Sequence, residues 1–77
     1  DALPIFYPNP FDEVLHIKSQ ENISAVVIQN ILGQHLLTLS FEQNEVEIPT
    51  SQLPSGMYVV QVHTQNGGLQ QVKILKK

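Results

Sequence analysis

Residues 57–64, MYVVQVHT, show the cleanest two-residue alternation of side chains in this sequence. Tyr58, Val60 and Val62 recur at a spacing of two residues and alternate with polar residues such as Gln61. Successive side chains of a β-strand point to opposite faces, so this spacing places the three large side chains on one face. Tyr and Val are also enriched in strands because they pack well on a pleated surface. We therefore predict a central strand whose Tyr58, Val60 and Val62 face a core.

A hairpin signal follows this strand directly. The run QNGG, residues 65–68, combines Asn with Gly, which tolerate the positive φ angles that tight hairpin turns require. The segment 69–76 then predicts a last strand that pairs back, with Val72 and Ile74 pointing inward.

A corner precedes the central strand. Residues 53–58, LPSGMY, resemble the sandwich corner in which a Tyr hydroxyl bonds back to the upstream backbone. We therefore expect Tyr58 to bury its ring and to hold this corner through its hydroxyl. Pro49 lacks a backbone donor, so it should end the strand that comes before the corner or confine that strand to a sheet edge.

Period-two runs separated by Gly, Pro and polar clusters also fill the upstream part of the chain. Asn30 and Gly33 predict a hairpin turn, and the polar run 42–45 predicts another turn. The inward side chains expected between these turns are Leu15, Ile17, Val26, Ile28, Leu37, Leu39, Phe41, Val46 and Ile48. The expected strands are the stretch before Pro8 and the segments 12–18, 23–29, 34–41, 46–48, 57–64 and 69–76.

About seven short strands with frequent turns predict an all-β fold, an immunoglobulin-like antiparallel β-sandwich. The 77 residues predict a single domain, 1–77, with 42% hydrophobic and 14% charged residues. Cys is absent, so strand pairing must supply the stability that disulfides often give to small domains. The N-terminal residues lack the basic region and apolar stretch of a secretory signal, so if a parent protein is exported, we expect its export signal to lie outside this chain.

Composition argues against two classes of partner. The formal net charge is −3 with only four Lys plus Arg, which disfavours nucleic-acid binding through a basic patch. No apolar run approaches the roughly 20 residues of a membrane-spanning helix, so membrane insertion is not predicted.

The sequence contains no motif of a known catalytic or cofactor site. It has no nucleophile elbow, phosphate-binding loop or metal-binding helix motif, so we predict no enzyme activity, no cofactor and no metal. The three histidines lie on separate predicted strands at positions 16, 35 and 63. The carboxylate pairs Asp12–Glu13 and Glu45–Glu47 would need a cleft to act as acid and base, and a sandwich this small has no residues to build one.

Taken in order, the runs YPNPFDEVLHI, QNILGQ, IPTSQLPSGMYVVQV, NGG and KILKK resemble a type IX secretion system (Por secretion system) C-terminal sorting domain. The resemblance covers nearly the whole chain. The family pattern matches, residue by residue, Pro8, Asn9, Pro10, Gly33, Leu53, Pro54, Gly56, Tyr58, Lys73 and Lys76, and we add the neighbouring Lys77 to the candidate recognition residues. Asn30 departs from the Asp common before the family's turn glycine, which keeps the turn chemistry but removes a charge.

The resemblance implies that residues 1–77 are the C-terminal end of a larger secreted protein. This protein would be a cargo of a Gram-negative bacterium that passes through the periplasm, where the outer-membrane type IX translocon recognises the domain. The resemblance also implies that a sortase-like signal peptidase then cuts before this domain, and that the N-terminal cargo is anchored at the cell surface or secreted. The last strand, with Lys73, Lys76 and Lys77, is the expected contact because its edge can be extended by a partner strand. Two alternatives stay open: a carbohydrate-binding or adhesive module, with Phe6, Tyr7 and Phe11 as its candidate aromatic side chains, and a structural spacer.

Overall fold

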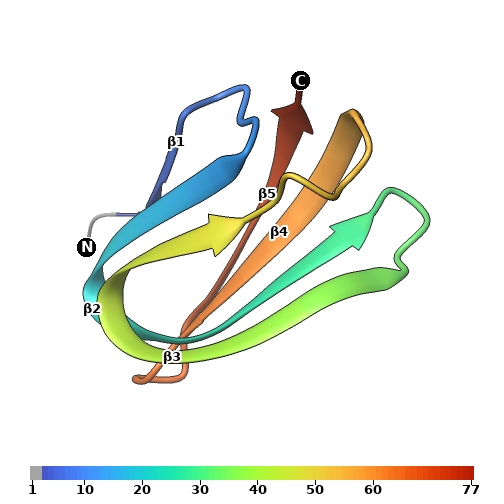
Figure 1. The fold of residues 1–77 in the computed structure, drawn as a ribbon. Coiled ribbons are helices and arrows are strands. Elements are labelled where there is room, and N and C mark those ends of the chain that lie inside the picture. Colours follow the sequence, from blue (N-terminus) through green and yellow to red (C-terminus); the bar gives the residue numbers. More distant parts are fainter. Residues whose placement is uncertain (1–2) are drawn as a thin grey trace.

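The computed structural model describes residues 3–77, and within that range the chain forms five strands and no helix (Figure 1). The strands are β1 (Ile5–Tyr7), β2 (Val14–Asn30), β3 (His35–Pro49), β4 (Gly56–Thr64) and β5 (Leu69–Lys76). All pairings between them are antiparallel, in the order β1-β2-β4-β5, and β3 pairs with the other side of β2. The all-β prediction is confirmed.

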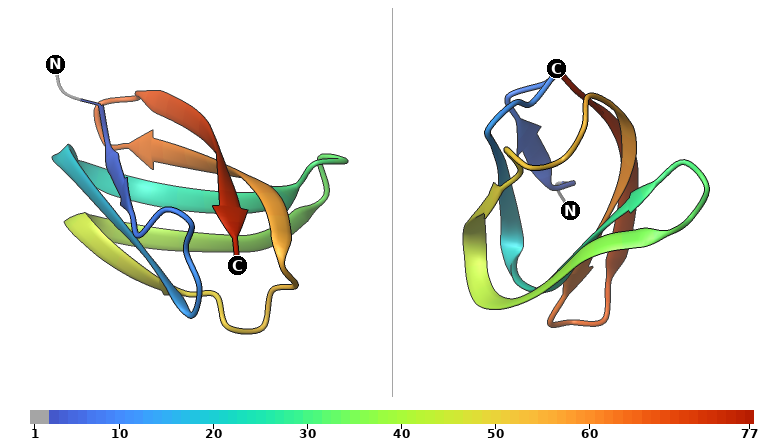
Figure 2. Two further views of the ribbon diagram at one scale, coloured as in Figure 1. Left: turned by 90° about the horizontal axis from the view of Figure 1, so that it is seen from above. Right: turned by 45° about the vertical axis from the view of Figure 1, so that its right-hand side comes forward.

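Two long strands give the sheet its shape. β2 and β3 run side by side and bend together, so the sheet curls back until its two arms face each other (Figures 1 and 2). One arm consists of β1, the first half of β2 and the last part of β3. The other consists of the rest of β2 and β3 together with β4 and β5. The register of β2 against β3 shifts between Lys18 and Ile23, which is where the ribbon bends.

The predicted seven strands are therefore corrected to five, in one curled sheet instead of two separate sheets. The expected strands 12–18 and 23–29 are both parts of β2, and 34–41 and 46–48 are both parts of β3. The polar run 42–45 was expected to be a turn, but it continues β3 through the bend. Gln43 still pairs with Ile23 and Glu45 with Lys18, because both strands bend at the same place and keep their ladder.

The core lies between the two arms and matches the period-two pattern. One arm contributes Leu15, Ile17, Val46 and Ile48, and the other contributes Val26, Ile28, Tyr58, Val60, Val62 and Ile74, all buried. Leu37, Leu39, Phe41 and Val72, also expected inward, are half-buried against this core. Val59 was expected on the outer face. Val27 points to the outer face as well, because it lies between the inward-facing Val26 and Ile28. Both side chains are nevertheless buried. Each lies on a strand paired on both sides, so cross-strand neighbours cover it.

Two of the predicted turns have the expected chemistry. The Asn30 side-chain oxygen accepts hydrogen bonds from the backbone N–H groups of Leu32 and Gln34, both at 3.0 Å. Gly33 then adopts φ 89°, a left-handed conformation that favours glycine. Gly67 has the same φ of 89° in the turn between β4 and β5. Both hairpins are confirmed.

Truncating the core should destabilise the domain strongly. Ile28 is fully buried, so Ile28→Ala should lower the free energy of unfolding by about 2–5 kcal/mol, through lost burial and the cavity left behind. The matched control is Leu32→Ala at the β2–β3 turn, where the side chain is 81% exposed and the expected change is within about 0.5 kcal/mol. Urea unfolding measures both, and equal losses would show that Ile28 contributes no more than a surface residue.

Candidate functional site

The Pro8-Asn9-Pro10 bend joins β1 to a short segment that runs along the last strand. The Tyr7–Pro8 and Asn9–Pro10 peptide bonds are both cis. Pro8 and Asn9 are exposed and Pro10 is half-buried, so the first two residues of the bend are accessible from solvent. The residue that follows, Phe11, is fully buried in the core.

Phe11 connects the beginning of the chain to its last strand. Its backbone N–H donates to the carbonyl of Leu75 at 3.0 Å, and its own carbonyl accepts from the N–H of Lys77 at 2.9 Å. These two bonds make a parallel bridge with Lys76. The aromatic ring of Phe11 also contacts that of Tyr58, with ring centroids 6.2 Å apart.

The three C-terminal lysines occupy different environments. Lys76 is only 6% exposed, and its Nζ lies 3.8 Å from the Oδ1 of Asp12, whereas Lys73 and Lys77 are exposed. In β5, Lys76 shares the inward face with Ile74, so its aliphatic stem covers the end of the core while its amine reaches Asp12. The lysines therefore do not form one basic patch.

The corner before β4 closes as expected. The Tyr58 hydroxyl donates to the backbone carbonyl of Pro54, and Leu53 packs against the core cluster. Gly56 has φ 146°, in the region that favours glycine, and lies directly opposite Lys76 in the β4–β5 ladder. The corner and the last strand thus meet at the same end of the sheet.

Thr50 was missed by the sequence analysis, although it ties the corner to the segment after the bend. Its side chain is 1% exposed; its hydroxyl donates to the carbonyl of Asp12 at 2.8 Å, and its N–H donates to the carbonyl of Glu13 at 2.8 Å. The N–H of Leu53 in turn donates to the Thr50 carbonyl at 3.0 Å. The only sequence signal was a Thr directly after the strand-ending Pro49.

The predicted motif residues therefore gather mainly at one end of the molecule. The bend, the corner and the end of β5 are joined through Phe11, Thr50 and Tyr58. Gly33 is different: it lies in an exposed turn, and a Cβ added there would meet no atom within 4 Å. Asn30, at the start of that turn, is opposite Tyr58 in the β2–β4 ladder, so the turn begins beside the corner strand.

The outer face of the smaller arm carries an aromatic and acidic cluster. Tyr7 and His16 stack with centroids 4.9 Å apart and planes 5° apart, and the Tyr7 hydroxyl donates to Glu45 Oε2 at 3.1 Å. Partial burial of the ring, the hydrogen bond to Glu45 and the negative charges of Glu45 and Glu47 raise the pKa of the Tyr7 hydroxyl above its ordinary value. The hydroxyl is therefore a neutral donor at physiological pH.

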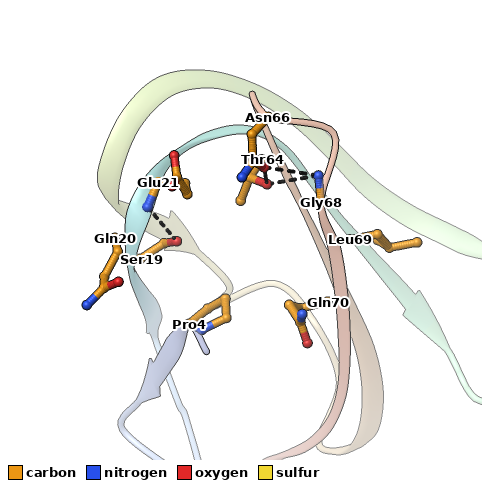
Figure 3. A pocket seen from close by; sticks show the side chains of 9 residues that line it. All are labelled: Pro4, Ser19, Gln20, Glu21, Thr64, Asn66, Gly68, Leu69 and Gln70. Atoms are coloured by element: carbon orange, nitrogen blue, oxygen red, sulfur yellow. Dashed lines mark hydrogen bonds between the residues drawn. The ribbon is translucent and has the colours of Figure 1, made fainter. Parts of the chain in front are cut away.

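A polar hollow of about 320 Å³ lies at the opposite end from the gathered motifs. Pro4, the β2 bend at residues 19–21 and the β4–β5 hairpin line it, as Figure 3 shows. In that hairpin, the Gly68 N–H donates to Thr64 Oγ1 and to Asn66 Oδ1, both at 3.1 Å. Among residues 3–77, the lining consists mainly of hydroxyl and amide groups, together with the carboxylate of Glu21 and the apolar side chains of Pro4 and Leu69.

The residues considered for catalysis or metal binding remain dispersed. His16, His35 and His63 lie on β2, β3 and β4, and within residues 3–77 no three His, Asp or Glu side chains gather where a metal ion could be held. Asp12 contacts Lys76, while Glu45 and Glu47 lie on the exposed face of β3. In this same range, no helix has the length and apolar character to cross a membrane.

Comparisons with known proteins agree with the sequence resemblance. The model of a family described as secretion system C-terminal sorting domain matches residues 5–77. Among solved structures, the chain is similar to PorZ, an essential bacterial surface component of the type-IX secretion system of Porphyromonas gingivalis, with a TM-score of 0.77 and 20% sequence identity. The similarity covers 96% of this chain but 11% of the PorZ chain, and at this identity it concerns the fold alone. The comparison with curated proteins gives no match.

The corner bond should have a measurable effect on stability. Tyr58→Phe removes the hydroxyl that bonds Pro54 and keeps the ring, so the free energy of unfolding should fall by about 1 kcal/mol. Tyr7→Phe is the control, because it removes an exposed hydroxyl bond and should change the free energy by less than about 0.5 kcal/mol. Urea unfolding of both variants tests this. An unchanged free energy of unfolding for Tyr58→Phe would show that the corner bond does not stabilise the domain.

The two β5 lysines should differ in the same way. Lys76→Ala exposes the end of the core and should lower the free energy of unfolding by about 1–2 kcal/mol, through lost packing of the stem. Lys73→Ala, on the same strand but exposed, should stay within about 0.5 kcal/mol of the parent. Thermal and urea unfolding give the comparison, and the reverse order of losses would contradict the burial of Lys76.

Proposed function

The chain belongs to the secretion system C-terminal sorting domain family, and we propose that it sorts an attached N-terminal cargo for export through the type IX outer-membrane translocon. The observation that carries the proposal is the convergence of the family motifs on one end of the fold. The bend, the corner and β5 come from distant parts of the chain, and Phe11, Thr50 and Tyr58 join them. The signal is then a folded surface instead of a linear peptide.

The exposed part of this end would be what the translocon contacts. Pro8, Asn9, Lys73 and Lys77 are exposed, whereas Tyr58 and Lys76 are buried and hold the surface in shape. We assign Leu53, Pro54 and Gly56 to the same supporting role, because they form the corner that Tyr58 ties down. Gly33 shapes a separate turn.

The proposed route takes the cargo through the periplasm to the cell surface or the medium. There, a sortase-like signal peptidase would separate the cargo from this domain and anchor the cargo. The domain itself would do no chemistry, and we assign it no catalytic residue, cofactor or metal. Its two facing arms would correspond to the layers of an immunoglobulin-like sandwich joined by the bent β2–β3 ribbon.

A carbohydrate-binding role has less support. Stacking on sugars needs exposed aromatic rings, but Phe11 is fully buried, and Phe6 packs against the core. Tyr7 is 37% exposed, and one of its ring faces is taken by His16. The surface therefore offers one partly covered ring where a sugar platform displays several.

A secretion assay with a matched pair of variants tests the proposal. A reporter directed to the periplasm and fused ahead of this domain should appear outside a Gram-negative host that has a type IX system. Asn9→Ala, in the exposed bend, should reduce the exported fraction several-fold while leaving the thermal unfolding temperature unchanged.

Asn44→Ala is the control, because Asn44 is also exposed but lies at the β3 bend, away from the gathered motifs. We expect this variant to be exported like the parent. Retention of the parent fusion in the periplasm would contradict the sorting function. Equal export of Asn9→Ala and the parent would remove the bend from the contact surface.

A further inference from the structure

The free side of β5 is a sheet edge with unpaired backbone groups. In the β4–β5 ladder, the N–H of Thr64 bonds the carbonyl of Gly68, so residues at even positions of β5 face β4. At the other end, Leu75 and Lys77 bond Phe11 on the opposite side, which confirms that odd positions face outward. The N–H and C=O groups of Leu69, Gln71 and Lys73 therefore point away from β4. Within residues 3–77 no strand pairs with them.

The chain itself already uses the end of this edge. Phe11 fits between Leu75 and Lys77 as a parallel strand would, and the Pro8-Asn9-Pro10 bend then carries the chain away toward β1. Pro10 has no N–H and could not continue the ladder. The edge is thus closed at residues 75–77 and open over 69–73, a length of about 17 Å.

The other open edges are protected over part of their length. Folded proteins guard exposed edges with charged side chains, prolines or very short strands. β1 has three residues with a proline on each side, and the last part of β3 carries Glu42, Glu45, Glu47 and Pro49. The first part of β3, residues 35–41, has no proline and no Lys, Arg, Asp or Glu. Within the described residues, however, β5 is the open edge that already receives another segment of the chain, at Phe11. Over 69–73, the β5 edge has no proline and one charge, that of Lys73.

The side chains of this edge define what would pair with it. Leu69 is 51% exposed and borders the polar hollow (Figure 3). Gln71 and Lys73 are exposed further along the strand. Met57, Val59, Gln61 and His63 share the outer face on β4, so this face offers Lys73 no carboxylate. An incoming strand that carried an acidic residue would pair with Lys73, and an apolar residue would cover Leu69.

We infer that the β5 edge over residues 69–73 receives an extended segment of the export machinery by strand addition, with a carboxylate beside Lys73 and an apolar side chain beside Leu69. The inference rests on the proposed sorting function and names how its partner binds. Backbone hydrogen bonds would provide affinity with little demand on side-chain identity.

A proline placed on the edge tests strand addition directly. Gln71→Pro removes an outward N–H without breaking a β4–β5 bond, so it should block pairing and reduce export of a reporter fusion by at least about tenfold, the effect of roughly 1.4 kcal/mol. Thr38→Pro is the matched control on the open edge of β3. Backbone hydrogen bonds alternate between the two sides of a strand. Followed from β4 to β2 and from β2 to β3, this alternation leaves the N–H and C=O groups of Thr38 pointing outward from the sheet. The Thr38 side chain is exposed.

A charge reversal provides a second test that does not depend on proline. Lys73→Glu should also reduce export, because it would repel the partner's carboxylate, while Lys18→Glu changes the net charge equally on the other arm and should not. Thermal unfolding of each variant verifies that the domain is folded.

The outcomes separate the two proposals. Export of the parent, Gln71→Pro and Lys73→Glu alike would overturn strand addition and leave the sorting function standing, whereas failure of the parent would overturn both. Equal losses in Gln71→Pro and Thr38→Pro would contradict the choice of β5. If the fusion forms a dimer by size-exclusion chromatography that Gln71→Pro abolishes, a second copy occupies the edge and the inference is wrong.

Discussion

The joint bend of β2 and β3 is the constraint on which the rest of the structure depends. A flat ribbon of this length would have one apolar face in water, because nothing else in so short a chain could cover it. Bending both strands at Lys18–Ile23 and Gln43–Glu45 folds that face onto itself. The apolar side chains of the two halves then pack against each other as one core, and the remaining strands extend the two arms.

A few long-range contacts hold together the end of the domain that lies opposite the β2–β3 bend. The buried Phe11, the Tyr58 hydroxyl and the Thr50 hydroxyl each connect segments that a simple meander would leave apart. Lys76 covers the same end with its stem and places its charge at Asp12. The predicted motif residues therefore divide into a buried set that builds this end and an exposed set that, under the proposed function, would contact a partner.

The sequence predicted the inward face of each strand well, because a period of two residues leaves little freedom once one face is apolar. It also predicted the Asn30–Gly33 turn, the β4–β5 hairpin and the Tyr58 corner, whose chemistry is local. The predicted turn at the polar run 42–45 was wrong, because polar residues occur both where a chain reverses direction and on the outer side of a bent strand. The positions of Thr50 and Phe11 and the burial of Lys76 depend on contacts between distant segments, which periodicity does not encode.

The backbone pairing of Phe11 with Leu75 and Lys77 has a consequence for the order in which the chain can fold. The N–H of Lys77 and the carbonyl of Leu75 are needed to fix Phe11, so this contact cannot form until residues 75–77 have left the ribosome. A polypeptide that stopped before residue 69 would lack β5 and leave Phe11 without its backbone partners. Correct folding of this small unit thus depends on its last strand being present.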